Sequence, residues 1–251
     1  MKPTILVTND DGINSPGLHA LTRAMRNIGN VYIIAPDREK SAAGHSVTFH
    51  HPLRAEKLSV REIQIDGTPT DCVMYGILHF LKQKPDLVAS GINRGPNLGD
   101  DITYSGTVSA AIEGTLHGIP SFAISVATFT KPQYDSAARF AKVIAGMLLT
   151  KTLPAETLLN INVPNLPYEK IEGIEITKQG KRIYRDSIIE KTDPRGRHYY
   201  WIGGEEPTYK EELGTDFYAI AQNKISITPI HLDLTNYSAF STIKKWNLKL
   251  K

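Results

Sequence analysis

The sequence predicts an α/β fold, built on an open and mostly parallel β-sheet with helices on both faces. Two observations carry this prediction. Short apolar runs alternate with longer stretches in which apolar residues recur at helical spacing, and glycine or proline separates several of these segments. Such alternation is typical of β-α-β units, whose parallel strands are joined by right-handed crossovers.

The first helix and the strands beside it are the most clearly defined elements. Residues 5–7 form a continuous apolar run, as expected for a buried strand. Apolar residues recur at helical spacing over residues 18–28, and Gly29 follows as a terminator. Residues 31–35 repeat the strand pattern, which stops at Pro36.

The middle of the chain continues the same alternation. Each apolar run there follows a stretch with helical spacing, which we interpret as a helix that leads into a strand. The expected helices cover residues 71–81, 108–117 and 134–149, and the expected strands cover residues 87–90, 122–126 and 158–163.

The character of the sequence changes after Pro164. Strand-like runs at residues 187–192 and 197–202 flank a turn that contains proline and glycine, so we expect a β-hairpin. Its second strand carries three consecutive aromatic residues, Tyr199, Tyr200 and Trp201. In a protruding hairpin such an aromatic surface meets a partner, and the alternative is that the arm folds back on its own core.

We expect one domain over residues 1–251, with three parts. A sheet-and-helix core occupies about residues 1–180, and a protruding hairpin arm occupies about residues 181–222. A closing strand and a C-terminal helix, with their patterns at residues 224–229 and 236–246, occupy about residues 223–251.

The composition limits the classes of function. The chain has 251 residues and a net charge of +3, too small a charge to indicate a nucleic acid polymer as partner. Cys72 is the single cysteine, so no intrachain disulfide forms and a reducing compartment is expected. The N-terminus lacks the pattern of a signal peptide, and the mostly apolar stretch at residues 119–129 is too short to span a membrane. We therefore expect a cytoplasmic protein.

The pair Asp10–Asp11, directly after the first predicted strand, is the strongest functional signal. Two adjacent carboxylates repel each other, and the pKa of one rises unless a cation lies between them. A buried pair therefore indicates a hard divalent metal with oxygen ligands. Because Asp11 precedes Gly12, a solvated turn is the alternative.

Two further strand ends carry polar groups. A loop that contains Ser41 and His45 follows the second strand, and a loop that contains Asn93 and Asn97 follows the strand at residues 87–90. In an open parallel sheet, ligands bind beyond the carboxyl ends of the strands. Convergence of three such loops favours a metal or anion site over an isolated turn.

The segment Ser105-Gly106-Thr107 opens a predicted helix. Its free backbone N–H groups, its hydroxyls and the positive end of the helix dipole suit a phosphate group. The alternative is that Ser105 or Thr107 is an ordinary N-cap. His45 is a candidate acid or substrate contact, and a plain surface histidine is its alternative.

These segments resemble the SurE family (survival protein E), the 5'/3'-nucleotidases. The resemblance runs in order along nearly the whole chain, and its longest segments lie in the N-terminal half. The matching segments are ILVTNDDGINSPG at 5–17, APDREKSAAGHSVT at 35–48, GTPTDC at 67–72, SGINRGPNLGDDITYSGTVSA at 90–110, NINVP at 160–164 and ITPIHLDLT at 227–235.

The resemblance implies a divalent-metal-dependent phosphatase that hydrolyses nucleoside 5'- and 3'-monophosphates to nucleoside and phosphate. Short-chain polyphosphate is a further substrate to consider. One Mg²⁺ or Mn²⁺ per subunit is implied, on Asp10, Asp11, Ser41 and Asn93. The implied fold is a Rossmann-like sheet with a C-terminal extension that is exchanged between the subunits of a dimer, and pairs of dimers form tetramers.

The mechanism we expect is direct attack by a water on a metal-bound phosphomonoester, with Asp10 and Asp11 as the catalytic residues. Asn97 and the helix start at Ser105, Gly106 and Thr107 hold the remaining phosphate oxygens, and Asn9 is a further phosphate-binding candidate. Transient phosphorylation of one aspartate is the alternative mechanism. A nucleotide or anion sensor without catalysis is the alternative class of function.

Overall fold

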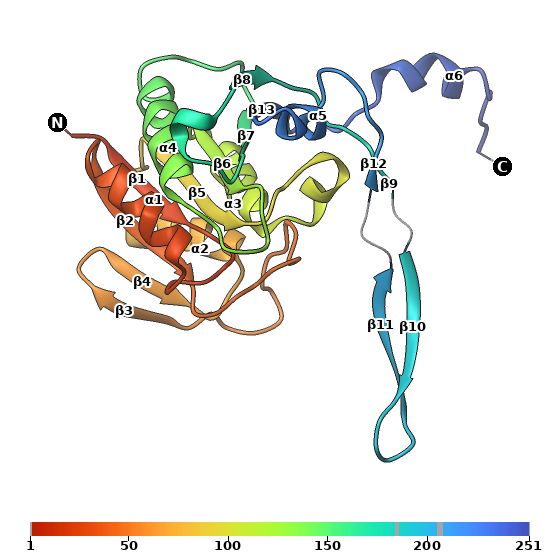
Figure 1. The fold of residues 1–251 in the computed structure, drawn as a ribbon, viewed down its shortest axis with the longest axis horizontal. Coiled ribbons are helices and arrows are strands. Elements are labelled where there is room, and N and C mark those ends of the chain that lie inside the picture. The colour runs from red at the N-terminus through yellow and green to blue at the C-terminus, as the bar shows by residue number, and fades with distance from the viewer. Residues whose placement is uncertain (1, 184–185, 205–207, 251) are drawn as a thin grey trace.

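The computed structural model describes residues 2–183, 186–204 and 208–250 (Figure 1). Its central feature is a mixed, mostly parallel sheet of nine strands in the order β3-β4-β2-β1-β5-β6-β7-β13-β8. The neighbours of β1 on both sides are parallel to it, whereas β3 and β13 run antiparallel to a neighbour. The predicted α/β class with a mostly parallel sheet is thus confirmed.

The strands of this sheet follow the predicted order, with three additional members. They are β1 Thr4–Thr8, β2 Asn30–Pro36, β3 Ala55–Ser59, β4 Glu62–Ile65, β5 Leu87–Arg94, β6 Ser121–Val126, β7 Thr157–Val163, β8 Gly173–Ile176 and β13 Lys224–His231. The additional strands β3, β4 and β8 are short and lie at or beside the edges of the sheet. Every residue of β3 is exposed, so no apolar alternation marks it in the sequence.

Helices cover both faces of the sheet. The α-helices are α1 Pro16–Arg26, α2 Pro69–Tyr75, α3 Gly106–Leu116, α4 Asp135–Leu148, α5 Asp216–Ala221 and α6 Phe240–Lys244. Short 3-10 turns occur at η2 Gly99–Tyr104, η3 Tyr168–Lys170 and η4 Tyr237–Ala239, and η1 Gly76–Phe80 is a π-helical turn.

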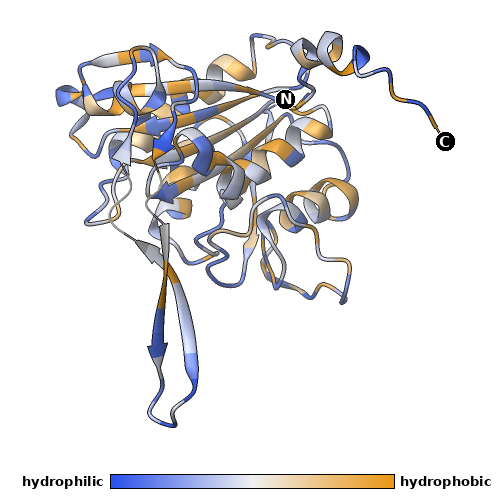
Figure 2. Ribbon diagram, turned by 90° about the vertical axis from the view of Figure 1, so that its right-hand side faces the viewer, coloured by the Kyte–Doolittle hydropathy of each residue, from blue (hydrophilic) through white to orange (hydrophobic). Residues whose placement is uncertain are grey.

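Side chains along β1 point alternately to the two faces of the sheet, and each face has its own buried apolar core. Ile5 and Val7 pack with residues of α1 and α4 on one face, and Leu6 packs with residues of α2 and α3 on the other. Because both faces of β1 are buried, its sequence is continuously apolar rather than alternating. Figure 2 shows apolar residues concentrated in these central strands.

The strand order places a switch point at β1. From β1 the chain passes to β2 on one side and later to β5 on the other, so the connections leave β1 in opposite directions. A crevice opens at the carboxyl edge of the sheet at such a point, and ligands bind there. The loops after β1, β2 and β5 all begin at this edge.

Two predicted helices differ in length. The helix expected at residues 71–81 begins earlier, because Thr68 and Asp71 form a capping box, and it passes into the π-helical turn η1 after Tyr75. The helix expected at residues 236–246 was predicted too long: the structure has η4 and the five-residue α6. None of the residues of α6 is buried, and a short helix without a packed face has little to extend it.

The predicted hairpin is confirmed as strands β10 Asp186–Thr192 and β11 His198–Gly204, which project from the body (Figure 1). Tyr200 and Trp201 remain more than half exposed, so the arm does not fold back on its own core. Strands β9 Arg182–Ile183 and β12 Thr208–Tyr209 form a second small ladder at its base. The expected arm at 181–222 includes residues 184, 185 and 205–207, which lie outside the described residues.

No helix within the described ranges is both long and apolar enough to cross a membrane. The expected single domain with its three parts stays a prediction.

Asp216, at the start of α5, connects the C-terminal part to the loop after β5. Its Oδ2 atom accepts a hydrogen bond from the backbone N–H of Gly99 at 2.7 Å. Its Oδ1 atom accepts from Gly180 at 2.8 Å and from Phe217 at 2.9 Å. Burial raises the pKa of this carboxyl, and these N–H groups oppose that effect.

We predict that Asp216→Ala lowers the free energy of unfolding by roughly 3 kcal/mol, because three backbone donors lose a fully buried acceptor. Urea unfolding measures the difference. Asp216→Asn keeps one acceptor oxygen and should lose less, and the exposed Glu172→Ala serves as a neutral control. Equal stabilities of Asp216→Ala and Glu172→Ala would contradict the assignment.

Candidate metal and phosphate site

The three polar loops predicted from the sequence converge at the carboxyl edge of the sheet. The backbone N–H of Lys40, next to Ser41, donates to the carbonyl oxygen of Asp10 at 2.7 Å. The backbone N–H of Arg94, next to Asn93, donates to Oδ2 of Asp11 at 3.2 Å. The loop after β2 and the end of β5 therefore both contact the acidic pair that follows β1.

Asp10 lies buried between β1 and the N-terminus of α3. The hydroxyl of Thr107 donates to its Oδ1 atom at 2.5 Å. Burial raises the pKa of Asp10 to about 6, the Thr107 hydroxyl partly offsets this effect, and the charge of Asp11 adds to it. Burial is thus the main cause of the raised pKa of Asp10, and the charge of Asp11 acts in the same direction.

Gly106 permits this close approach. A Cβ atom at position 106 would lie 2.8 Å from Cβ and 3.0 Å from Oδ2 of Asp10. Any larger residue would therefore displace either the carboxylate or the helix start. The glycine between Ser105 and Thr107, which capping alone does not require, thus has a steric reason.

Asp11 is half-buried and faces a cavity of about 680 Å³. Burial raises the pKa of its carboxyl, and contact with Arg94 lowers it again. Arg94 and Tyr134 line the same cavity, together with the loop after β2. The acidic pair thus presents one deeply buried carboxylate and one that borders an open cavity.

Ser41 and Asn93, each adjacent in sequence to a residue that contacts the pair, carry neutral oxygen atoms. The amide nitrogen of Asn93 donates to the carbonyl oxygen of Gly95 at 2.8 Å, which leaves its amide oxygen as the atom suited to a cation. The hydroxyl of Ser41 is exposed and donates to Oε1 of Glu39 at 2.8 Å. Because a hydroxyl oxygen also carries lone pairs, this contact is compatible with a metal ligand.

The donor set fits a hard divalent cation. Two carboxylates, an amide oxygen and a hydroxyl are the ligand types that Mg²⁺ and Mn²⁺ accept. Within residues 2–183, 186–204 and 208–250, no three His, Cys, Asp or Glu side chains gather in a way that would hold a metal. A site here accordingly depends on neutral oxygen donors as well as on the acidic pair.

Of the phosphate-binding candidates, Asn97 is buried in the loop after β5, and Ser105, Thr107 and Asn9 divide into two groups by their contacts. Ser105 caps α3 by accepting the N–H of Val108 at 3.1 Å, and Thr107 contacts Asp10, so both lie at the helix start as predicted. Asn9 instead holds the acidic turn, since its amide nitrogen donates to the carbonyl oxygen of Gly12 at 3.0 Å and to the Ser15 hydroxyl at 2.7 Å. Binding of phosphate by any of them stays a prediction.

His45 lies beside α3, in contact with one carboxylate. Its Nε2 atom is 2.9 Å from Oε2 of Glu113, whose other oxygen is 3.1 Å from Nε2 of His117. This contact fastens the loop after β2 to the middle of α3. The role of His45 as an acid or substrate contact stays a prediction, and the structure gives it a loop-anchoring contact.

Several residues of the site were missed in the sequence. Arg94 and Tyr134 border the cavity beside Asp11, and Glu39 holds the Ser41 hydroxyl. Arg94 and Glu39 lie within segments that match the SurE family, so that resemblance could have drawn attention to them. Tyr134 comes from the start of α4, and only the three-dimensional fold brings it to the cavity.

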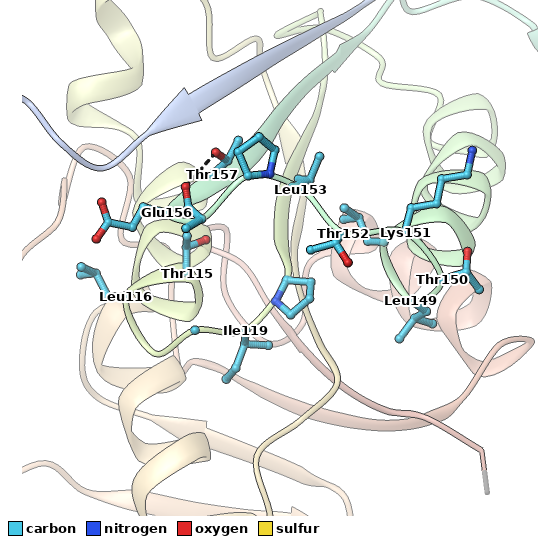
Figure 3. Close-up of a pocket in the computed structure, with 15 residues that line it drawn as sticks. Thr115, Leu116, Ile119, Leu149, Thr150, Lys151, Thr152, Leu153, Glu156 and Thr157 are labelled. Carbon is cyan, nitrogen blue, oxygen red and sulfur yellow. Dashed lines mark hydrogen bonds between the residues drawn. The ribbon is translucent and has the colours of Figure 1, made fainter.

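A separate hollow of about 590 Å³ lies at the opposite edge of the sheet (Figure 3). Its lining comes from the end of α3, the residues before β6, and the connection from α4 to β7, with Thr115, Ile119 and Lys151 among them. The predicted site residues, all of which lie in described parts of the chain, do not line it. The acidic pair therefore lies away from this hollow.

Comparisons with known proteins identify the family to which this chain is similar. The family model for survival protein SurE matches residues 5–186. The 5'-nucleotidase SurE of Geobacter sulfurreducens is 55% identical, over 97% of this chain and 94% of that protein. The 5'-nucleotidase SurE of Geotalea daltonii is 54% identical, over 97% of this chain and 99% of that protein.

A solved structure is similar in both fold and sequence. The crystal structure of the SurE protein from Aquifex aeolicus aligns with a TM-score of 0.88 and 47% identity, and the alignment covers 98% of this chain and 100% of that chain. The family model covers more than half of this chain, and the relatives align over nearly all of it. The chain therefore belongs to the SurE family.

Proposed function

We propose that this SurE-family 5'-nucleotidase hydrolyses nucleoside 5'- and 3'-monophosphates with one divalent metal ion per subunit. The observation that carries the proposal is the acidic pair, in which buried Asp10 meets the N-terminus of α3 and Asp11 borders an open cavity. Two carboxylates without a cation would repel a phosphate group. The proposal therefore includes a metal on Asp10, Asp11, Ser41 and Asn93.

The residues of the site would have separate roles in the hydrolysis. A bound Mg²⁺ or Mn²⁺ would neutralise the acidic pair and act as a Lewis acid toward the phosphoryl oxygen. Thr107 holds Asp10 in place, and Arg94 holds Asp11 through its backbone N–H. Asn97 and the start of α3 would face the remaining phosphate oxygens, where negative charge spreads in the transition state.

Assembly and substrate range belong to the same proposal. The exposed aromatic arm of β11 and the exposed apolar residues of the C-terminal segment, such as Leu234 and Trp246, suit a homodimer that exchanges its extensions and pairs into a tetramer. Short-chain polyphosphate would present the same terminal phosphate to the site. A cytoplasmic location accords with the single cysteine, Cys72, which is buried.

The direct test is phosphate release from 5'-AMP, 3'-AMP and tripolyphosphate, with Mg²⁺, with Mn²⁺ and with EDTA. We expect release that requires a metal and that falls by at least about a hundredfold in Asp11→Asn, while the unfolding midpoint is preserved. Release at full rate in EDTA or in Asp11→Asn would contradict the proposal. Binding of AMP without release under any metal would favour a sensor.

Substitution of Gly106 tests the geometry of the same pair. The new Cβ atom in Gly106→Ala would displace the Asp10 carboxylate or the start of α3, so we expect AMP hydrolysis to fall by about a hundredfold. Gly146→Ala is the matched control, because that glycine lies in α4 and a Cβ atom added there would meet no atom within 4 Å. Equal activities of the two variants would show that the close approach is unimportant.

The pKa of Asp10 predicts how metal affinity depends on pH. In the metal-free protein the carboxyl holds its proton below about pH 6, and a metal must displace that proton. We expect the Mn²⁺ affinity measured by calorimetry to fall as the pH drops below about 6. Thr107→Val removes the hydroxyl, so the loss of Mn²⁺ affinity should occur at higher pH. Thr107→Ser keeps the hydroxyl and should leave the pH dependence unchanged. An affinity that is constant between about pH 5 and 7 would contradict this account.

A further inference from the structure

Two asparagines of β7 have no role in the site described so far. Asn160 and Asn162 belong to the NINVP segment and are fully buried. Ile161 lies between them and points to the opposite face of the sheet, where it joins the main apolar core. Burying two amide side chains in a central strand is costly unless they form hydrogen bonds, so their partners indicate why they are there.

Both asparagines hold the peptide groups of Asn97, in the loop after β5. The Oδ1 atom of Asn162 accepts the backbone N–H of Asn97 at 2.8 Å, and its amide nitrogen donates to the carbonyl oxygen of Asn97 at 2.9 Å. The amide nitrogen of Asn160 donates to the same carbonyl oxygen at 2.8 Å. The side chain of Asn162 thus pairs with both backbone groups of one residue, as a neighbouring strand would.

The side chain of Asn97 is held from the adjacent strand. Its amide nitrogen donates to the hydroxyl of Ser125 in β6 at 2.9 Å. Ser125 pairs with Asn162 in the register of β6 and β7, so both contacts come from neighbouring positions on one face of the sheet. Three buried side chains therefore determine the position of a single loop residue.

The loop needs such anchoring because its own backbone is permissive. Gly95 and Gly99 flank Asn97 and both have positive φ, +111° and +51°. The loop is fastened at Gly99 by Asp216, and it leads through η2 to the start of α3. Between the two glycines, the hydrogen bonds of Asn97 are what join this stretch of the loop to the strands of the sheet.

We propose that Asn160 and Asn162 are positioning residues, which hold Asn97 and its loop in the conformation that receives the phosphate group. This inference rests on the proposed phosphatase function. It assigns the pair an effect on phosphate affinity rather than on metal affinity, because Asp10 and Asp11 are held by separate contacts from Thr107 and Arg94.

The test compares Asn162→Ala with the parent enzyme and with Thr228→Val. Thr228 is buried in β13, pairs with Asn160 in the register, and forms a hydrogen bond with Thr177 at 2.7 Å, so its hydroxyl serves a different part of the sheet. We expect Asn162→Ala to raise the KM for AMP and the inhibition constant of orthophosphate by about tenfold, with the Mn²⁺ affinity within about twofold of the parent. Thr228→Val should leave all three constants unchanged.

Hydrogen exchange gives a readout that does not depend on activity. The amide of Asn97 should exchange slowly in the parent and at least about tenfold faster in Asn162→Ala. Where Asn162→Ala fails to fold, Ser125→Ala removes only the acceptor of the Asn97 side chain and should still weaken orthophosphate severalfold. Unchanged constants in the folded variant, or equal changes in Thr228→Val, would overturn the inference. A parent enzyme without phosphatase activity but with a protected Asn97 amide would instead contradict the proposed function.

Discussion

The contact between the Asp10 carboxylate and the N-terminus of α3 is the interaction on which the site depends. It joins the end of β1 to a helix nearly a hundred residues later in the chain, and it requires glycine at position 106. The helix start supplies a hydroxyl to the carboxylate, while burial raises the pKa of Asp10 and disfavours its charged form. A divalent cation would reverse that preference, which links metal binding to the geometry of the helix.

The surrounding sheet holds the other components relative to this contact. Backbone N–H groups of Lys40 and Arg94 bring the loop after β2 and the end of β5 to the acidic pair. In the segment that follows β5, buried polar side chains from β6, β7 and α5 hold Asn97 and Gly99. The acidic pair that would bind the metal and the loop that would bind the phosphate are thus supported by different contacts. Metal affinity and phosphate affinity should therefore respond separately to substitution.

Local patterns in the sequence predicted the central elements, because β1, β2, β5 and α1 are buried and carry the apolar periodicity of their type. The acidic pair was recognisable because adjacent carboxylates after a buried strand are unusual electrostatically. Strand β3 was not predictable, since all its residues are exposed, and α6 was overestimated because it lacks a buried face. The contact of Asp216 with Gly99, across 117 positions, and that of Asn162 with Asn97 depend on the folded sheet and leave no local pattern.

The most direct test of the account is the location of a bound metal. Crystals soaked in Mn²⁺ should show one anomalous peak per subunit, within bonding distance of carboxylate oxygens of both Asp10 and Asp11, and none in crystals of Asp11→Asn. The amide oxygen of Asn93 and the hydroxyl of Ser41 should lie in the same coordination shell. A peak at another site, or an acidic pair that stays metal-free at saturating Mn²⁺ and neutral pH, would contradict the central claim.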